Sequence, residues 1–220
     1  MKNSTYLQLA FNHTFLEFAA AIPHIPRHPN ILIEAGTPLI KREGIGVVSR
    51  MRQSWGGKVV ADLKVVDGAA AEVRMAAQAG ASYVTACGTS SIETLRIFIE
   101  ECKKAGICSV IDMMNVVNPL KTMWQVNLVP DAVYIHRGRD EETAYGKLLQ
   151  YKHIAKLKGK WDNLVGAAGG IDKKELQSAI FNGANIVVVN IVKPGDPWKG
   201  LVLDESFKTS VDQFLQFVVR

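Results

Sequence analysis

K-V-V-A-D-L-K-V-V-D, residues 58–67, is an apolar run that ends in charged residues, and G-A-A-A-E-V-R-M-A-A-Q, residues 68–78, follows it directly. The first run predicts a strand over 58–63, because its apolar residues do not alternate with polar ones, as in parallel strands covered on both faces. The second is rich in alanine and predicts a helix that ends at Gly80, a residue suited to a helix C-terminus. Another apolar run follows at 82–86. This stretch therefore predicts a strand–helix–strand unit of a parallel sheet.

The same alternation runs through the whole chain. We expect strands at Tyr6–Phe11, Ile31–Ala35, Lys58–Leu63, Ser82–Ala86, Ile107–Ile111, Ala132–Ile135, Leu164–Ala167 and Ile186–Val189. We expect further helices at Ser91–Lys104, Asp172–Phe181 and Asp204–Val219. Eight units in 220 residues leave about 27 residues for each strand, loop and helix. An open doubly wound sheet is the alternative, but no G-x-G-x-x-G follows the first strand. The sequence predicts an α/β protein, a (β/α)8 TIM barrel of parallel strands in one domain, residues 1–220.

Composition excludes several other classes of protein. The chain has 48% hydrophobic and 21% charged residues, with a net charge of +5, which excludes a disordered, collagen-like or coiled-coil protein. Its basic residues are scattered without interleaved aromatic residues, so we expect no nucleic-acid partner. No apolar run approaches the roughly 18 residues that span a bilayer, so we expect no membrane association. Three cysteines without a C-x-x-C pair indicate a reducing, cytoplasmic location.

Polar residues end most of the predicted strands, where a barrel of this type has its active site. Alternation along the third strand places Asp62 and Lys64 on one face. A lysine flanked by carboxylates stays charged and can stabilise a carbanion-like centre or deliver a proton. On its own, however, the pattern D-x-K-x-x-D is equally typical of an ion pair at the end of a strand.

Longer motifs carry a resemblance to a known family. They are V-A-D-L-K-V-V-D-G at 60–68 with Q-A-G-A at 78–81, I-E-A-G-T-P-L-I at 33–40, D-M-M-N at 112–115 and G-G-I at 169–171. In this order, the chain resembles the orotidine-phosphate-decarboxylase superfamily. Within it, the chain is most similar to 3-hexulose-6-phosphate synthases and 3-keto-L-gulonate-6-phosphate decarboxylases.

The resemblance implies a role for each matching residue. Glu34 and Asp62 match carboxylates that bind Mg²⁺, and Lys64 matches a lysine that stabilises an enediolate. Asp67 matches a residue that reaches into the partner's site in these homodimeric enzymes, and the resemblance implies that Asp112 and His136 lie around the sugar and its proton-transfer route. Sugar-phosphate binding is implied for Asn12, Glu34, Arg139, Gly169, Gly170 and Asn190, and Lys193 is a further candidate.

Three departures from the family pattern concern substrate binding. Asn12 stands where the family has an aspartate. Asn190-Ile191 replaces a glycine–arginine pair that binds phosphate, and a longer segment, Lys193-Pro-Gly-Asp-Pro-Trp-Lys199, follows. Lys193 or Lys199 is a candidate for the missing charge, although an ammonium does not reproduce the two-point grip of a guanidinium.

The resemblance implies a Mg²⁺-dependent aldehyde-lyase that reversibly joins formaldehyde and ribulose 5-phosphate through an enediolate. His136 and Arg139 are spaced as in the keto-gulonate decarboxylases, so decarboxylation of a 3-keto sugar-acid phosphate stays open, with orotidine-phosphate decarboxylation less favoured. A barrel that binds sugar phosphates with impaired catalysis is a further alternative, because of Asn12 and Ile191. We also expect Lys64 to be protonated beside Asp62, Asp67 and Glu34, and its replacement to leave folding intact.

Overall fold

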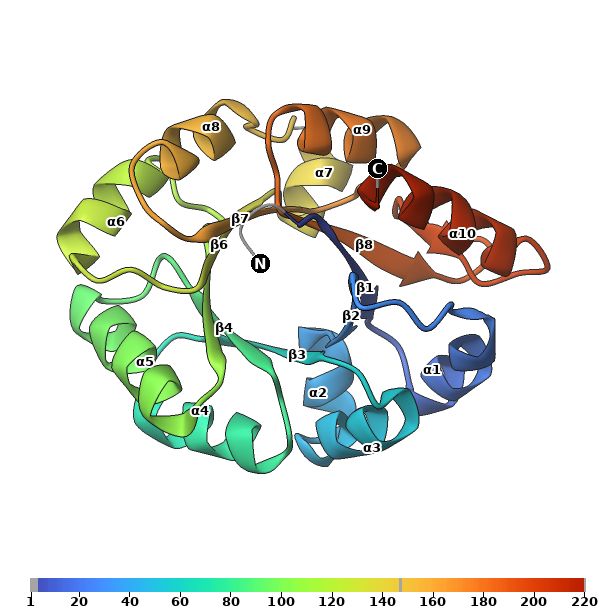
Figure 1. Ribbon diagram of the computed structural model, residues 1–220, viewed down its shortest axis with the longest axis horizontal. Helices are drawn as coiled ribbons and strands as arrows, with labels where there is room; N and C mark the ends of the chain where they lie inside the picture. Colours follow the sequence, from blue (N-terminus) through green and yellow to red (C-terminus); the bar gives the residue numbers. More distant parts are fainter. Residues whose placement is uncertain (1–3, 147, 220) are drawn as a thin grey trace.

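Eight parallel strands form a closed barrel inside a ring of helices (Figure 1). The structure is a computed structural model that describes residues 4–146 and 148–219. Within these residues the barrel strands are β1 (Tyr6–Phe11), β2 (Ile31–Ala35), β3 (Val59–Val65), β4 (Tyr83–Cys87), β5 (Cys108–Asp112), β6 (Ala132–His136), β7 (Leu164–Ala168) and β8 (Ile186–Val192). Each strand pairs with the next, and β8 pairs with β1 from Tyr6↔Ile186 onward, which closes the barrel. The predicted (β/α)8 barrel is confirmed.

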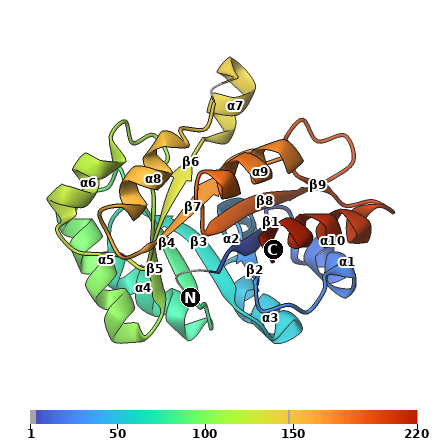
Figure 2. The ribbon, with the colours of Figure 1, turned by 45° about the horizontal axis from the view of Figure 1, so that its top comes forward.

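The helices lie outside the sheet and cover its outer face. They are α1 (Phe15–Ala21), α2 (Thr37–Glu43), α3 (Gly46–Trp55), α4 (Ala69–Gln78), α5 (Ile92–Ala105), α6 (Pro119–Val126), α7 (Arg139–Tyr145), α8 (Lys152–Lys158), α9 (Lys173–Phe181) and α10 (Phe207–Val218), with a short 3₁₀ turn η1 (Ile22–His24). Two of the expected helices start at Ser91 and Asp172, and these residues are the N-caps of α5 and α9, where they accept hydrogen bonds from the first turn. Helix α4 begins at Ala69, one residue later than expected, because Gly68 is its N-cap and has a left-handed backbone conformation. Figure 2 shows α7 standing apart from the other helices.

Alternation along the strands separates two layers of apolar packing. On β1, Leu7 and Leu9 pack outward against helices, whereas Tyr6 and Ala10 face the barrel interior. The interior apolar layer consists of Tyr6, Ala10, Leu32, Val60, Tyr83, Val110, Ala132, Tyr134, Leu164, Ala168, Ile186 and Val188. Because these side chains fill the interior, this part of the barrel is a packed core.

Strand β3 is irregular at the mouth of the barrel. Its register against β4 shifts between Ala61 and Val65, and Lys64 has a φ of 48°. A left-handed conformation is uncommon for a residue with a side chain and carries local strain. The Lys64 N–H donates to Thr85 Oγ1 at 2.9 Å, and Cys87 Sγ lies 3.5 Å from the Lys64 carbonyl oxygen. These contacts from β4 hold the irregular backbone.

Strand β8 is longer than the sequence indicates. It continues through Asn190 to Val192 and adds a short parallel strand, β9 (Leu201–Val202). Ile191 is consequently a buried strand residue that faces the helices. The position that carries an arginine in the related pattern is therefore part of the core here.

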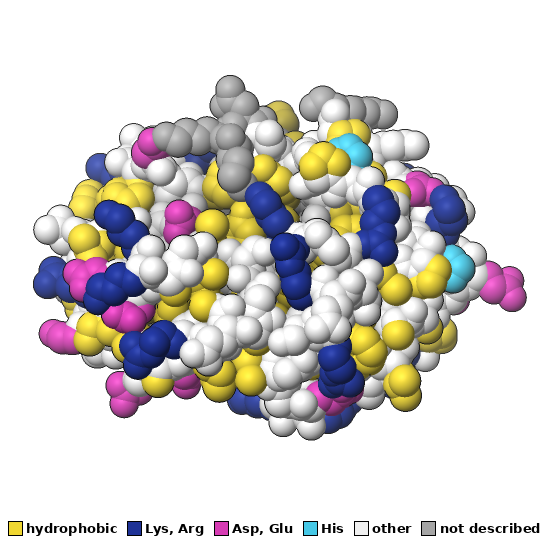
Figure 3. Space-filling view, turned by 60° about the horizontal axis from the view of Figure 1, so that its bottom comes forward, with side chains coloured by type: hydrophobic (Ala, Val, Ile, Leu, Met, Phe, Trp, Pro, Cys, Tyr) yellow, Lys and Arg dark blue, Asp and Glu magenta, His cyan; other side chains and the backbone are white. Residues whose placement is uncertain are grey.

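On the face of the molecule drawn in Figure 3, basic and acidic side chains are interspersed with hydrophobic ones. None of the helices in the described ranges is long and apolar enough to span a membrane.

Candidate active site at the barrel mouth

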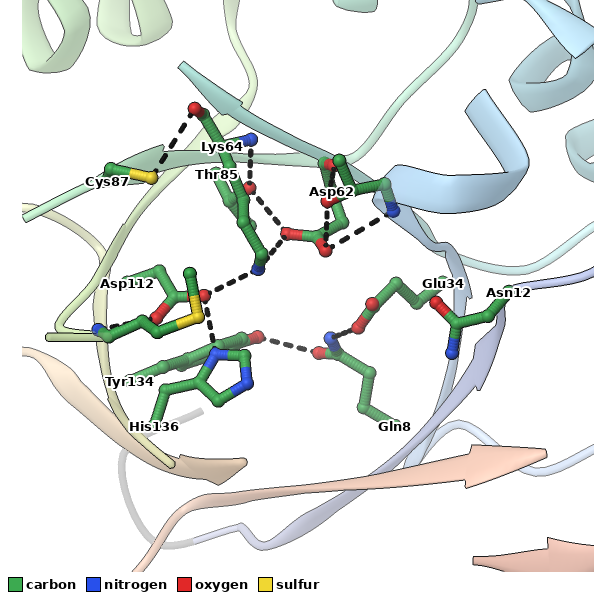
Figure 4. A network of polar contacts seen from close by, with 12 residues as sticks. Gln8, Asn12, Glu34, Asp62, Lys64, Thr85, Cys87, Asp112, Tyr134 and His136 are labelled. Atoms are coloured by element: carbon green, nitrogen blue, oxygen red, sulfur yellow. Dashed lines mark hydrogen bonds and ion pairs between the residues drawn. The ribbon is translucent and has the colours of Figure 1, made fainter. Parts of the chain in front are cut away.

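Polar side chains occupy the last inward positions of the strands, at the carboxyl-terminal mouth. They surround a cavity of about 460 Å³. Site residues predicted from the sequence that line it are Asn12, Glu34, Asp62, Lys64, His136, Arg139, Gly169, Gly170 and Asn190. The structure thus brings most of the predicted residues to one cavity, and Figure 4 shows the polar contacts around Lys64, Asp62 and Glu34.

Lys64 lies between two buried carboxylates. Its Nζ is 3.0 Å from Asp62 Oδ1 and 2.7 Å from Asp112 Oδ2. Burial acts to lower the pKa of Lys64, but the charges of Asp112 and Asp62 outweigh it, and the pKa is raised. Lys64 is therefore protonated at neutral pH, as expected. Its second partner is Asp112 from β5, however, and not the expected Asp67, which lies exposed on the turn after β3.

Asp112 joins Lys64 to a histidine. Its Oδ2 lies 2.7 Å from Nδ1 of His136, and its Oδ1 accepts the N–H of Met114 at 3.0 Å. Burial would raise the pKa of Asp112, but His136 and Lys64 together hold that pKa well below its usual range. The carboxylate therefore stays ionised and fixes the imidazole, whose other nitrogen faces away from Asp112 (Figure 4).

Asp62 is held in place by two threonines. Thr37 Oγ1, from the start of α2, donates to Asp62 Oδ2 at 2.7 Å, and Thr85 Oγ1 donates to Asp62 Oδ1 at 2.8 Å. Since Thr85 also accepts the Lys64 N–H, one hydroxyl orders both the carboxylate and the strained turn. Asp62 is thus rigidly oriented toward the mouth.

Glu34 is a buried carboxylate at one end of a series of hydrogen bonds that crosses the barrel interior. Gln8 Nε2 donates to Glu34 Oε2, and Tyr134 OH donates to Gln8 Oε1 at 2.6 Å. Burial, and next the nearby charge of Asp62, raise the pKa of Glu34 to about 8 against the opposing effect of Lys64. Glu34 therefore needs an additional positive charge to ionise fully at neutral pH.

The donor set at Glu34 and Asp62 fits a hard divalent cation. Both carboxylates face one cavity, and the charge of Asp62 adds to burial in raising the pKa of Glu34, so a cation between them would favour its ionised form. Mg²⁺ is commonly bound by one or two carboxylates, with water and substrate oxygens completing its octahedron. In the part of the chain that the structure describes, no cluster of three or more His, Cys, Asp or Glu could bind a metal ion. Any Mg²⁺ here would therefore depend on water and substrate oxygens for most of its ligands.

The glycine turn after β7 lies at the opposite side of the mouth from the Lys64 cluster. Gly169 and Gly170 have φ values of 101° and 61°. A turn of two such residues favours an anion-binding concavity of backbone N–H groups. Beside it, Asn190 accepts a hydrogen bond from Asn12 Nδ2 at 3.2 Å. Neither asparagine carries a charge, so the cations on this side come from elsewhere.

Neither lysine of the long segment after β8 replaces the missing arginine. Lys193 pairs with Glu17 on α1 at 2.5 Å and is not among the residues that line the mouth cavity. Lys199 pairs with Asp172 at 3.0 Å. Instead, the guanidinium of Arg139 lines the cavity and lies 4.0 Å from the ring centroid of Trp198 in that segment. The cavity that contains the glycine turn is therefore lined by Arg137 and Arg139, and not by Lys193 or Lys199.

Gln8, Thr37, Thr85 and Tyr134 support the site but were not predicted. Gln8, Thr85 and Tyr134 each interrupt an apolar strand with a polar group at an inward position. Such an interruption is a signal that sequence alone provides, since a buried polar side chain needs a partner. Thr37 gives no such signal, because threonine is unremarkable at the start of a helix.

Comparisons with known proteins agree with this geometry. The family model described as Orotidine 5'-phosphate decarboxylase / HUMPS family matches residues 5–197. A protein named Bifunctional enzyme Fae/Hps from Methanocella arvoryzae is 39% identical over 194 residues, covering 85% of this chain and 48% of that protein. The protein of the same name from Methanosphaerula palustris is 35% identical over 219 residues, covering 97% of this chain and 53% of its own length. The chain thus spans about half the length of these relatives.

A solved structure gives the same result for the fold. The 3-hexulose-6-phosphate synthase from Salmonella typhimurium superimposes with a TM-score of 0.82 at 26% identity, covering 96% of this chain and 99% of that one.

Proposed function

Because this chain belongs to the Orotidine 5'-phosphate decarboxylase / HUMPS family, we propose that it is an aldehyde-lyase of the 3-hexulose-6-phosphate synthase type. It would join formaldehyde to ribulose 5-phosphate, reversibly, through an enediolate. The observation that carries the proposal is the cluster of Lys64, Asp62 and Asp112, which holds a protonated ammonium in a pocket of fixed carboxylates. The names of the relatives and of the Salmonella structure support this choice within the family.

The residues of the mouth suit the chemistry of an enediolate. A proton leaves C1 of ribulose 5-phosphate, the resulting carbon attacks formaldehyde to form the new C–C bond, and the alkoxide so formed takes up a proton. The Lys64 ammonium is positioned to stabilise negative charge developing on the substrate oxygens, and such preorganised charge is the most effective form of catalysis in a buried site. His136, oriented by Asp112, is suited to move the proton.

Glu34 and Asp62 would hold Mg²⁺, with Thr37, Thr85 and Gln8 fixing the two carboxylates. When bound, Mg²⁺ supplies positive charge for substrate oxygens. Asp62 and Asp112 already surround Lys64, and Glu34 needs a further positive charge to ionise, so the metal would offset the negative charge that an anionic intermediate brings.

Decarboxylation of a 3-keto sugar-acid phosphate is the second candidate. It is favoured by the pair His136 and Arg139, which both line the mouth cavity. Both reactions share the Lys64 cluster and differ in whether formaldehyde or carbon dioxide is exchanged. Arg139 stacked on Trp198 lies where it could serve either substrate.

An assay of formaldehyde-dependent loss of ribulose 5-phosphate, with and without EDTA, tests the proposal. We expect consumption that requires formaldehyde and is lost with EDTA, then restored by excess Mg²⁺. Release of carbon dioxide from a 3-keto sugar-acid phosphate, without formaldehyde-dependent turnover, would favour the second candidate. Tight binding of sugar phosphate without either reaction would instead indicate an impaired barrel.

We further propose a homodimer in which Asp67 approaches the partner's mouth. Asp67 and its neighbour Val66 are exposed on the turn after β3, and Val66 leaves 61% of its surface open. We expect light scattering at micromolar concentration to give twice the mass of the chain. Asp67→Arg should shift this mass toward the monomer, because it places a longer side chain of opposite charge at the proposed contact. The exposed Glu93→Arg on α5 is a matched control, and a wild-type monomer would contradict the proposal.

A cytoplasmic location is part of the same proposal. Cys87, Cys102 and Cys108 are all free thiols, and burial raises the pKa of each. Thiols of this kind are structural and are stable in a reducing compartment.

A further inference from the structure

Glu142 of α7 places a carboxylate against the glycine turn of the mouth. A Cβ atom built on Gly170 would lie 2.1 Å from Glu142 Oε2 and 2.2 Å from Oε1, so the carboxylate fills the space beside that glycine. Glu142 also lines the same 460 Å³ cavity as Gly169 and Gly170. An acidic side chain thus occupies the part of the mouth whose backbone conformation favours an anion.

Arg137 connects this carboxylate to the turn. The arginine is buried, and its Nη2 donates to the carbonyl oxygens of Gly169 at 2.8 Å and Gly170 at 3.0 Å. These bonds fix both peptide units of the turn. The ion pair from Nη2 to Glu142 Oε1 is longer, at 3.5 Å, and Arg137 has a second carboxylate partner in Glu175 at 3.3 Å. Arg137 therefore keeps a counter-ion if Glu142 leaves.

Helix α7 is suited to release its carboxylate. It has seven residues and stands apart from the ring of helices (Figure 2). Arg139, on its first turn, is held by Trp198. Of the α7 residues whose side chains the structure describes, 139–143, none belongs to the apolar core, so a movement of Glu142 leaves that core undisturbed.

A phosphate that enters this end of the mouth would be repelled by the Glu142 carboxylate, so Glu142 would have to move away. With Glu142 in place, two carboxylates already surround Arg137, and a phosphate beside Gly170 would meet like charge. Carboxylate and phosphate oxygens are held by the same donors, and like charges brought together in a dry site repel strongly. The two anions therefore cannot share this end of the mouth.

We propose that Glu142 is an internal competitor for the phosphate end of the site, which leaves Gly170 when a phosphate-bearing ligand binds and thereby sets the affinity for that ligand. The inference rests on the proposed function in that the substrate carries a phosphate group. It assigns to Glu142 control of affinity and specificity and no part in the bond-making steps.

The test is Glu142→Gln in the full chain, with two readouts. The first is KM and kcat for ribulose 5-phosphate with formaldehyde, and the second is the dissociation constant of inorganic phosphate by calorimetry, which needs no turnover. We expect KM and the phosphate dissociation constant to fall together by about tenfold, since neutralising one close like charge has an effect of this order. The turnover number should stay within about twofold. Glu142→Asp, which withdraws the carboxylate by one methylene, should give an intermediate decrease in both constants.

Glu93→Gln on α5 is the matched control, because it removes the same charge from an exposed position on another helix. Its constants should equal those of the wild type. Unchanged or weaker phosphate binding in both Glu142 variants would overturn the inference and indicate that Glu142 only supports Arg137. A wild-type chain without lyase activity would refute the proposed function, whereas the phosphate measurement would still decide the role of Glu142.

Discussion

Lys64→Ala should lose at least ~100-fold of the lyase rate, as expected for the removal of one preorganised charge at a reacting centre. Nζ of Lys64 bridges Asp62 and Asp112, so no other cation of this cluster can take its place. Turnover of ribulose 5-phosphate and formaldehyde under saturating conditions measures the effect. Lys103→Ala, an exposed lysine on α5, is the control and should be neutral. A folded Lys64→Ala protein with the wild-type rate would contradict the enediolate mechanism and favour the non-catalytic barrel.

The same substitution should also lower stability, in contrast to the expectation from sequence that folding is unaffected. The side chain of Lys64 is only 19% exposed, and its partner Asp112 is 2% exposed. Removing one member of a buried ion pair leaves an uncompensated charge, and partial exposure reduces the cost here to about 2–3 kcal/mol of unfolding free energy. Chemical denaturation measures this loss. Adding Asp112→Asn to Lys64→Ala should recover part of the stability and none of the rate, because it removes the orphaned charge without restoring the ammonium.

Glu34→Gln should abolish the response to Mg²⁺ and stabilise the metal-free protein at alkaline pH. The folded-state pKa of Glu34, about 8, lies above the ordinary value of 4.5. Between these values the unfolded chain releases its proton first, so stability of the metal-free protein falls as pH rises from about 4.5 to about 8. The neutral amide removes this loss, which is on the order of a few kcal/mol.

Denaturation in EDTA at pH 6 and pH 8 measures the difference. The wild type should be less stable at pH 8, and Glu34→Gln should depend less on pH. Adding Mg²⁺ should raise the melting temperature of the wild type alone, since binding to the folded state stabilises it. The variant should also lose at least ~100-fold in rate at limiting Mg²⁺. Equal pH dependence of the two proteins, together with equal stabilisation by Mg²⁺, would exclude Glu34 as a ligand.

The strands were predictable because each is a short run rich in apolar residues that parallel pairing buries on both faces. The limits of those runs were less certain, and β8 shows why: Asn190 looks like an end, yet its backbone continues the pairing with β1. Helix α7 carries few apolar residues, and its sequence does not separate it from a polar loop. Local pattern decides which segments form strands, while pairing with neighbours decides where they stop.

The candidate site was predictable to the extent that strand ends meet at one mouth. The pairing of Lys64 with Asp112 was not, because 48 residues separate them and the irregular turn of β3 directs the lysine toward β5. The position of Glu142 was equally unpredictable, since its carboxylate reaches Gly170 from another element of the fold. Contacts that cross the barrel depend on the register of all intervening strands, and no local pattern encodes them.

The alternation of inward and outward side chains has a consequence for how such a protein can change over time. Glu34, Asp62, Asp112 and His136 stand on four different strands, and each follows inward apolar residues that pack the same core. Replacing one of these groups changes polar contacts at the mouth and leaves the outer layer of packing against the helices untouched. Mutations can therefore sample new reactions one strand at a time, while the apolar layers below keep the barrel folded.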